Sequence, residues 1–136
     1  MTSKERINRA RESMEDALLF EREHMGNKTV LTKVYHAMID CLFTLLDIKD
    51  IGKLTHADII ERFEQGYVKE GKIDAAIFDV LRRTYDLTHE CDCEYMPIPT
   101  DREITAARLA AADLIRKATN PSTTEVTEHE SSAVQC

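Results

Sequence analysis

The residues best suited to chemistry lie together between positions 82 and 89. Arg82, Arg83, Asp86 and His89 bring two cations, a carboxylate and an imidazole into one short segment. In a phosphodiester transfer, a guanidinium can hold a phosphate oxygen through two parallel hydrogen bonds, and a histidine that titrates near neutral pH can move a proton of the attacking or leaving oxygen. An arginine and this histidine are therefore the first candidates for a catalytic pair.

Helical geometry distinguishes the two arginines. Arg82 lies about 20° around a helix axis from His89 and roughly 10.5 Å along it, whereas Arg83 lies about 120° away. We therefore favour Arg82, with Asp86 on the same face to orient the imidazole. The alternative is a solvent-exposed face without chemistry, on which Arg82 and Asp86 form an ion pair worth about 0.3–0.5 kcal/mol.

Two other histidines have different expected roles. His36 and Asp40 are neighbours on the polar side of a predicted helix, where they could line a site or form a plain surface pair. His56 stands at a predicted helix start, where we expect it to satisfy backbone groups rather than to act in catalysis.

The spacing of His89, Cys91 and Cys93 does not predict a metal site. Tetrahedral zinc sites usually separate paired cysteines by two to four residues and use two such pairs, and Cys91 falls on the core face of its helix. The chain also has no glycine-rich phosphate loop of either common type, which argues against an ATPase or a dehydrogenase. We therefore expect no metal and no cofactor.

Two aromatic residues flank the polar face that carries His89. Phe78 and Tyr85 are seven residues apart, and a row of solvated aromatic side chains is uncommon. Either this side meets a second subunit, where a composite site could form, or the first or fifth helix of the same chain covers it.

The helix that must position these residues spans positions 28–48. A surface helix needs an apolar stripe of only about 100°, and here the apolar residues fill about half of the circumference. We therefore expect this helix to lie in the middle of a bundle. Its apolar residues are Val30, Leu31, Val34, Tyr35, Met38, Ile39, Cys41, Leu42, Leu45, Leu46 and Ile48.

Four further helices surround it. Capping boxes predict helix starts at Thr2, Thr55 and Thr100, each with an acidic residue three positions later. The first helix is expected to end at Gly26 and Asn27, with Asn27 capping the central helix, and the third to end at Gly66. The fourth is expected over 73 to about 91, before two prolines that exclude a continuing helix.

Composition agrees with a helical domain. The chain has 136 residues, of which 43% are hydrophobic and 32% are charged, and its net charge is −7. We expect one domain over residues 1–119 and a disordered acidic tail over 120–136. The charge disfavours long-range attraction to nucleic acid, so any RNA contact must be local. Without an export signal or a membrane span, and without framework spacing of its cysteines, the chain is expected in the cytoplasm with reduced thiols.

Three segments together resemble a known family. KVYHAM at 33–38, THADIIERF at 55–63 and YVKEG at 67–71 resemble the HEPN domain (higher eukaryote and prokaryote nucleotide-binding) in its small stand-alone bacterial and archaeal form. In that form a tyrosine-rich second helix precedes a threonine–histidine helix start, a phenylalanine and a short valine–lysine–x–glycine turn. The resemblance covers roughly residues 7–118.

The resemblance implies an up-and-down helical bundle that dimerises and has one of two roles. Some family members are metal-independent ribonucleases, often toxins, in which an arginine and a histidine of an R-x4–6-H motif form a composite site with those of the dimer mate. Others are non-cleaving partners encoded beside a minimal nucleotidyltransferase. This chain departs from the pattern of an arginine before an aspartate–tyrosine pair, because the matching positions hold Thr88, Asp92 and Cys93, and His36 replaces the usual second tyrosine of the second helix.

We therefore expect an all-α antiparallel bundle of about five helices with one of two functions. The leading hypothesis is a HEPN-type homodimeric interaction protein that pairs with a nucleotidyltransferase in a toxin–antitoxin-like module. The alternative is a metal-independent endoribonuclease toxin that uses Arg82 or Arg83 with His89 across a homodimer interface. Thr88 and the acidic charge favour the first, and the surviving arginine–histidine spacing favours the second. A helical scaffold without partner chemistry is a third possibility.

Overall fold

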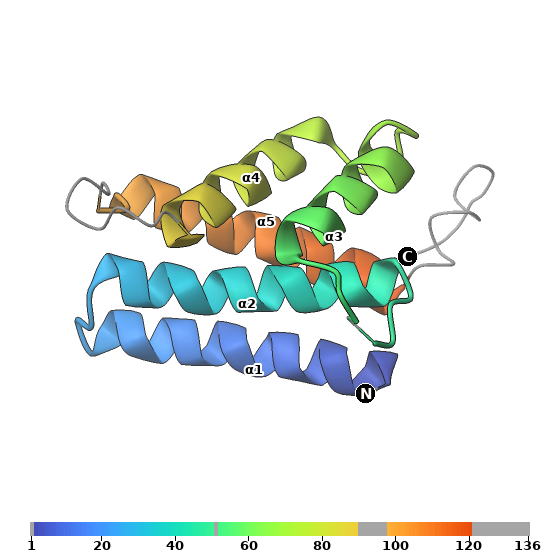
Figure 1. The fold of residues 1–136 in the computed structure, drawn as a ribbon. Helices are drawn as coiled ribbons and strands as arrows, with labels where there is room; N and C mark the ends of the chain where they lie inside the picture. Colours follow the sequence, from blue (N-terminus) through green and yellow to red (C-terminus); the bar gives the residue numbers. More distant parts are fainter. Residues whose placement is uncertain (1, 51, 90–97, 121–136) are drawn as a thin grey trace, which may run out of the picture.

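The computed structural model describes residues 2–50, 52–89 and 98–120 (Figure 1). Over these residues the chain forms five α-helices and no strand, so the predicted all-α bundle is confirmed. The helices are α1 (Ser3–Arg22), α2 (Asn27–Leu45), α3 (His56–Phe63), α4 (Ala75–His89) and α5 (Asp101–Thr119), and a π-helical turn, η1 (Glu64–Val68), continues α3. The tail beyond position 120 lies outside the described residues.

The three predicted capping boxes are all formed. In each, the threonine hydroxyl accepts a hydrogen bond from the backbone N–H three residues later, and the acidic side chain accepts one from the threonine backbone. These reciprocal bonds satisfy amide groups that have no partner inside the helix. They fix the starts of α1, α3 and α5 at Thr2, Thr55 and Thr100.

Several of the predicted helix boundaries are wrong. α1 ends at Arg22 rather than at Gly26 and Asn27, and α2 ends at Leu45 rather than at position 48. The N-cap of α2 is Gly26, whose φ of 95° favours glycine, and Asn27 is already helical. The Asn27 side-chain amide instead donates to the Pro99 carbonyl at 2.7 Å and to Asp101 Oδ1 at 3.0 Å, which ties the start of α2 to the start of α5. Gly66 does not end the third helix, because the helical path continues through it in η1.

The fourth helix begins slightly later than predicted. α4 starts at Ala75 rather than at position 73, after Gly71 turns the chain with a φ of 73°. Its predicted end near position 91 lies outside the described residues, as do Cys91, Cys93 and Cys136.

Cys41 is a buried free thiol of α2, and burial raises its pKa to about 12.

The central position of α2 is confirmed. α1 and α2 run antiparallel as a hairpin, and α5, α3 and α4 pack against the side of α2 that α1 leaves open (Figure 1). α2 contacts each of the other four α-helices, which explains why its apolar residues spread so far around the helix. No helix in the described part of the chain is long and apolar enough to cross a bilayer.

Candidate functional site

The structure brings together two tyrosines and three histidines from three helices. This tyrosine–histidine cluster consists of Tyr35 and His36 from α2, His56 from the first position of α3, and Tyr85 and His89 from the end of α4. The ring centres of His56 and His89 are 6.0 Å apart. The cap at Thr55 sets the direction of α3 and thereby places His56 beside α2.

Tyr35 is the centre of the cluster. Its side chain is 1% exposed, and its hydroxyl lies 2.9 Å from His56 Nδ1. Burial raises the pKa of Tyr35, so the phenol keeps its proton and donates it to Nδ1 of a neutral His56. Nε2 of His56 then carries the ring proton. The prediction that His56 satisfies backbone groups is wrong, because the His56 side chain binds the hydroxyl of a buried tyrosine.

His89 has different contacts from His56 and is more exposed than it. Its ring stacks on Tyr85 with centres 4.3 Å apart and meets the Tyr35 ring edge-on at 4.7 Å. Nδ1 lies 2.8 Å from the Thr88 hydroxyl and 3.1 Å from the Tyr85 carbonyl. Because the Thr88 hydroxyl donates to the Thr84 carbonyl, Nδ1 of His89 is the donor, and Nε2 of the neutral ring is left as the proton acceptor. Thr88 and Tyr85, not Asp86, orient this imidazole.

Neither candidate arginine joins the cluster. Arg83 Nε binds Glu103 Oε2 at 3.0 Å and connects α4 to α5. Arg82 is exposed and forms no ion pair with Asp86 or with any other described residue. Within the described part of one chain, therefore, His89 has no guanidinium beside it.

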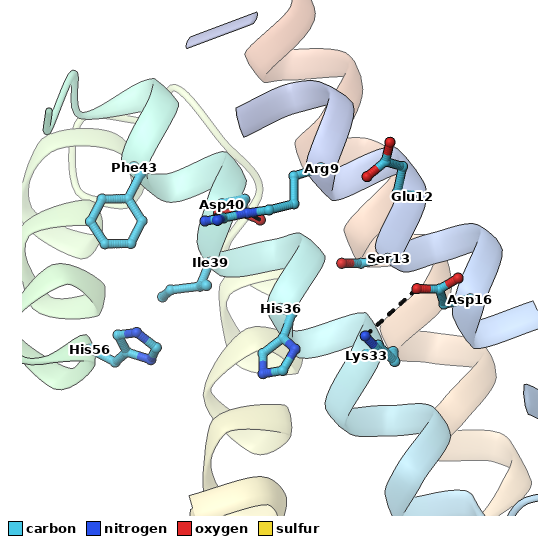
Figure 2. A pocket seen from close by; sticks show the side chains of 10 residues that line it. All are labelled: Arg9, Glu12, Ser13, Asp16, Lys33, His36, Ile39, Asp40, Phe43 and His56. Carbon is cyan, nitrogen blue, oxygen red and sulfur yellow. Dashed lines mark hydrogen bonds and ion pairs between the residues drawn. The ribbon is translucent and has the colours of Figure 1, made fainter. Parts of the chain in front are cut away.

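His36 and His56 also line a cleft of about 470 Å³ between α1, α2 and α3 (Figure 2). Its other lining residues are Arg9, Glu12, Ser13, Asp16, Lys33, Ile39, Asp40 and Phe43. Both cations are already engaged, because Lys33 pairs with Asp16 at 3.6 Å and Arg9 binds Asp40. The cleft therefore offers its two histidines, rather than a free cation, to a ligand.

One interpretation of the sequence expected Asp40 to form a surface pair with His36, and this interpretation is wrong. It is 3% exposed, because α1 covers this side of α2, and a buried carboxylate requires charged partners. Arg9 donates to both of its oxygens, from Nε at 3.0 Å and from Nη2 at 2.7 Å, and Arg6 Nη1 lies at 3.4 Å. The hydrogen bond to Asp40 raises the pKa of Arg9. The Arg6 guanidinium also lies 4.1 Å above the Phe43 ring.

The aromatic side chains flanking α4 contact α3 and α2, neither of which the two alternatives named. Phe78 is 6% exposed, and its ring packs 6.4 Å from that of Phe63 on α3. Tyr85 is partly buried in the tyrosine–histidine cluster. η1 and the Phe63 ring at the end of α3 lie against α4, so burial of Phe78 requires neither α1, α5 nor a second subunit.

Sequence reasoning missed the bond between Tyr35 and His56, although one signal for it was present. Tyr35 falls within the apolar arc of α2, and a buried tyrosine hydroxyl generally needs a hydrogen-bond partner. Among the described residues, no group of three or more metal-ligating side chains could hold a metal ion. Asp92 and Cys93, which the predicted HEPN resemblance uses, lie outside the described residues.

Comparison with known proteins gives one limited similarity. The chain is 23% identical over 62 residues to a protein of Methanocaldococcus jannaschii named "Putative toxin MJ0142". The match spans 46% of this chain and 42% of that protein, less than half of each. No family model matches the chain, and the resemblance to the HEPN family stays a prediction. No solved structure matches it either.

The buried carboxylate of Asp40 leads to a stability prediction. Asp40→Ala leaves the Arg6 and Arg9 guanidinium groups without their partner, and we expect it to lower the free energy of unfolding by about 3 kcal/mol. Asp79→Ala removes an exposed carboxylate of α4 and serves as the control. Urea unfolding of both variants measures the difference. Equal losses would contradict the assignment of Asp40 as a buried, paired charge.

The histidines lead to a pH prediction. Burial, followed by the charges of His89 and His36, lowers the pKa of His56, and partial enclosure with the charge of Lys33 lowers that of His36. Below the ordinary histidine pKa of 6.5, the unfolded chain therefore binds protons that the folded chain does not. We expect the free energy of unfolding to be highest above that pH and to fall as the pH drops through it.

Urea unfolding from pH 8 to pH 5 tests this sign. The double variant His36→Gln/His56→Gln should flatten the decline, whereas His24→Asn, in the turn between α1 and α2, should not. A decline that persists unchanged in the double variant would assign the proton uptake to other groups.

Proposed function

We propose that this chain is a helical interaction protein of a toxin–antitoxin-like module and that it partners a nucleotidyltransferase. Two observations support the proposal. The first is the similarity to a protein named as a toxin, although it covers less than half of each chain. The second is that neither Arg82 nor Arg83 lies beside His89 in the described chain, and this observation decides between the two predicted roles.

A cleaving site needs a group that stabilises the charge developing on phosphate, and arginine is the usual side chain for that task. Here Arg83 is bound to Glu103, and Arg82 points to solvent without an ion pair in the described chain. At the position where the family pattern has an arginine, the chain has Thr88, whose hydroxyl contacts His89 Nδ1. These contacts favour a partner that does not cleave RNA.

The ribonuclease alternative is supported by one observation, the grouping of His36, His56 and His89 around Tyr35. Two imidazoles with ring centres 6.0 Å apart, as in His56 and His89, could act as acid and base on one phosphodiester. In that mechanism Nε2 of His89 accepts the proton of the attacking 2′-hydroxyl. His56 would act in its protonated form, in which Nδ1–H donates to the Tyr35 hydroxyl and Nε2 gives its proton to the leaving oxygen, leaving a neutral ring. A dimer mate would have to supply the guanidinium.

Incubation of a mixed RNA pool with the purified protein in EDTA separates the two functions. We expect no cleavage above that of a buffer control, because no guanidinium of the described residues stands beside His89. His89→Ala is prepared identically, with His24→Ala as the matched histidine control. Cleavage that His89→Ala abolishes and His24→Ala retains would overturn the proposal and establish the ribonuclease.

The partner is tested separately, with a tagged chain expressed in its own host. We expect a nucleotidyltransferase to co-purify with it in stoichiometric amount. If no such protein co-purifies and RNA stays uncleaved, both functions are rejected in favour of a plain helical scaffold.

A further inference from the structure

Across the cleft of Figure 2, α1 and α2 face one another in an antiparallel register that brings their polar side chains level in pairs. At one level Lys33 of α2 meets Asp16 of α1, with 3.6 Å between Nζ and Oδ2. At another level Asp40 of α2 meets Arg9 of α1, which donates to both carboxylate oxygens. The charged groups at these two levels therefore have partners inside the chain.

The level between these two ion pairs is occupied by Ser13 of α1 and His36 of α2. Each lies three residues from the helix's own member of one ion pair and four residues from its member of the other, so the two fall opposite each other. Neither side chain makes a hydrogen bond to the other or to any further described residue. Ser13 is only 7% exposed, and Figure 2 shows its hydroxyl directed toward α2. Because a buried hydroxyl without a partner is unfavourable, this level is open to a ligand.

One carboxylate of the cleft also lacks a partner. Glu12 is exposed, lines the cleft next to Ser13, and forms no ion pair or hydrogen bond with a described residue. The other two carboxylates of the cleft are neutralised by the cations beside them. The charge that Glu12 can still bind is therefore positive, and the net charge of −7 adds a long-range attraction for cations.

His36 supplies a third acceptor without a partner. Partial enclosure, followed by the charge of Lys33, lowers the pKa of His36, so its ring is neutral near pH 7. One nitrogen of a neutral imidazole accepts a hydrogen bond. A carboxylate, a hydroxyl and an imidazole nitrogen, contributed by two facing helices, thus border the same part of the cleft.

The geometry points to a small primary amine as the ligand of this cleft, with its ammonium group between Glu12, Ser13 and His36. A primary ammonium has three N–H donors and no acceptor, so it matches the three unpartnered acceptors one for one. Donation from a cation to a carboxylate is also stronger than donation between neutral groups. The inference rests on the open level of α1 and α2 and is independent of the proposed function.

The rest of the cleft suits a short apolar body on this amine. Ile39, Phe43 and His56 border the side of the cleft away from α1 (Figure 2). The first two present hydrocarbon, and the His56 ring is fixed by its bond to the Tyr35 hydroxyl. The volume of about 470 Å³ lies within the usual range of ligand pockets. An amine with a short alkyl or aromatic group therefore fits better than a long polyamine.

Phenethylamine, which is an ammonium ion at pH 7.5, serves as the probe. It is titrated into the full chain while the ¹H–¹⁵N shifts of the backbone amides are followed by NMR. We expect a dissociation constant of about 1 mM, as for a small ligand with one well-placed polar group. The shifts should be confined to α1, α2 and the start of α3.

Three analogues with the same aromatic ring separate charge from hydrogen bonding. Phenethyl alcohol has no charge, phenylacetate has the opposite charge, and phenethyltrimethylammonium keeps the positive charge but has no N–H donor. Each should bind about tenfold more weakly than phenethylamine, because each leaves acceptors of the site without a partner.

Variants locate the ammonium group. Glu12→Gln and Ser13→Ala should each raise the dissociation constant about tenfold. Glu15→Gln removes an exposed carboxylate of α1 that does not line the cleft, and it should leave the affinity unchanged. Circular dichroism of each variant checks that the helical fold is kept.

The affinity should also fall as the pH drops from 7.5 to 5.5. A protonated His36 cannot accept a hydrogen bond and repels the ammonium group. His36→Gln keeps an acceptor and should reduce this pH dependence. The charged or titratable groups around His36 are Arg9, Glu12 and Asp16 of α1, Lys33, Tyr35 and Asp40 of α2, His56 of α3 and His89 of α4.

Several results would overturn the inference. One is the absence of binding up to about 20 mM phenethylamine, and another is a set of shifts that lies outside the cleft. A third is an alcohol or trimethylammonium analogue that binds as tightly as the amine, which would show that the N–H donors are unused. Equal affinities of Glu12→Gln and Glu15→Gln would exclude Glu12 as the partner of the ammonium group.

Discussion

The enclosure of α2 is the constraint on which the rest of this structure depends. A helix surrounded by four others cannot leave a polar group on its inner sides without a partner, because an unpaired buried charge or hydroxyl costs several kcal/mol. α2 carries two such groups, the carboxylate of Asp40 and the hydroxyl of Tyr35. Asp40 is satisfied by Arg6 and Arg9 of α1, and Tyr35 by His56 of α3. These bonds fix the positions of helices that apolar packing alone would hold less specifically.

The tyrosine–histidine cluster follows from this constraint. Once His56 is held against Tyr35, the end of α4 brings Tyr85 and His89 against the same ring, with His89 next to His56. The cluster therefore has a structural role in joining α2, α3 and α4, and the contacts of Nδ1 with Thr88 and Tyr85 fix how the exposed His89 ring is held. Within the described chain no guanidinium lies beside it, because Arg83 is bound to Glu103.

Local signals in the sequence predict much of the fold but little of the site. The capping boxes at Thr2, Thr55 and Thr100 and the wide apolar arc of α2 depend on residues close together in the chain, and the structure confirms them. Periodicity also assigns each residue to a face, but it does not say which neighbour covers that face. Asp40 looked solvent-exposed because no local signal places α1 over it, and Phe78 looked open to another subunit because α3 is short and folds back over α4.

A double-mutant cycle on Tyr35 and His56 tests most directly whether the buried polar groups of α2 hold its neighbours. Unfolding free energies are measured for the natural chain, Tyr35→Phe, His56→Ala and the double variant. The account predicts a coupling of about 1 kcal/mol, the net contribution of one partly buried hydrogen bond between contacting residues. Losses that simply add would show that α3 is positioned by apolar packing alone, and they would contradict the account.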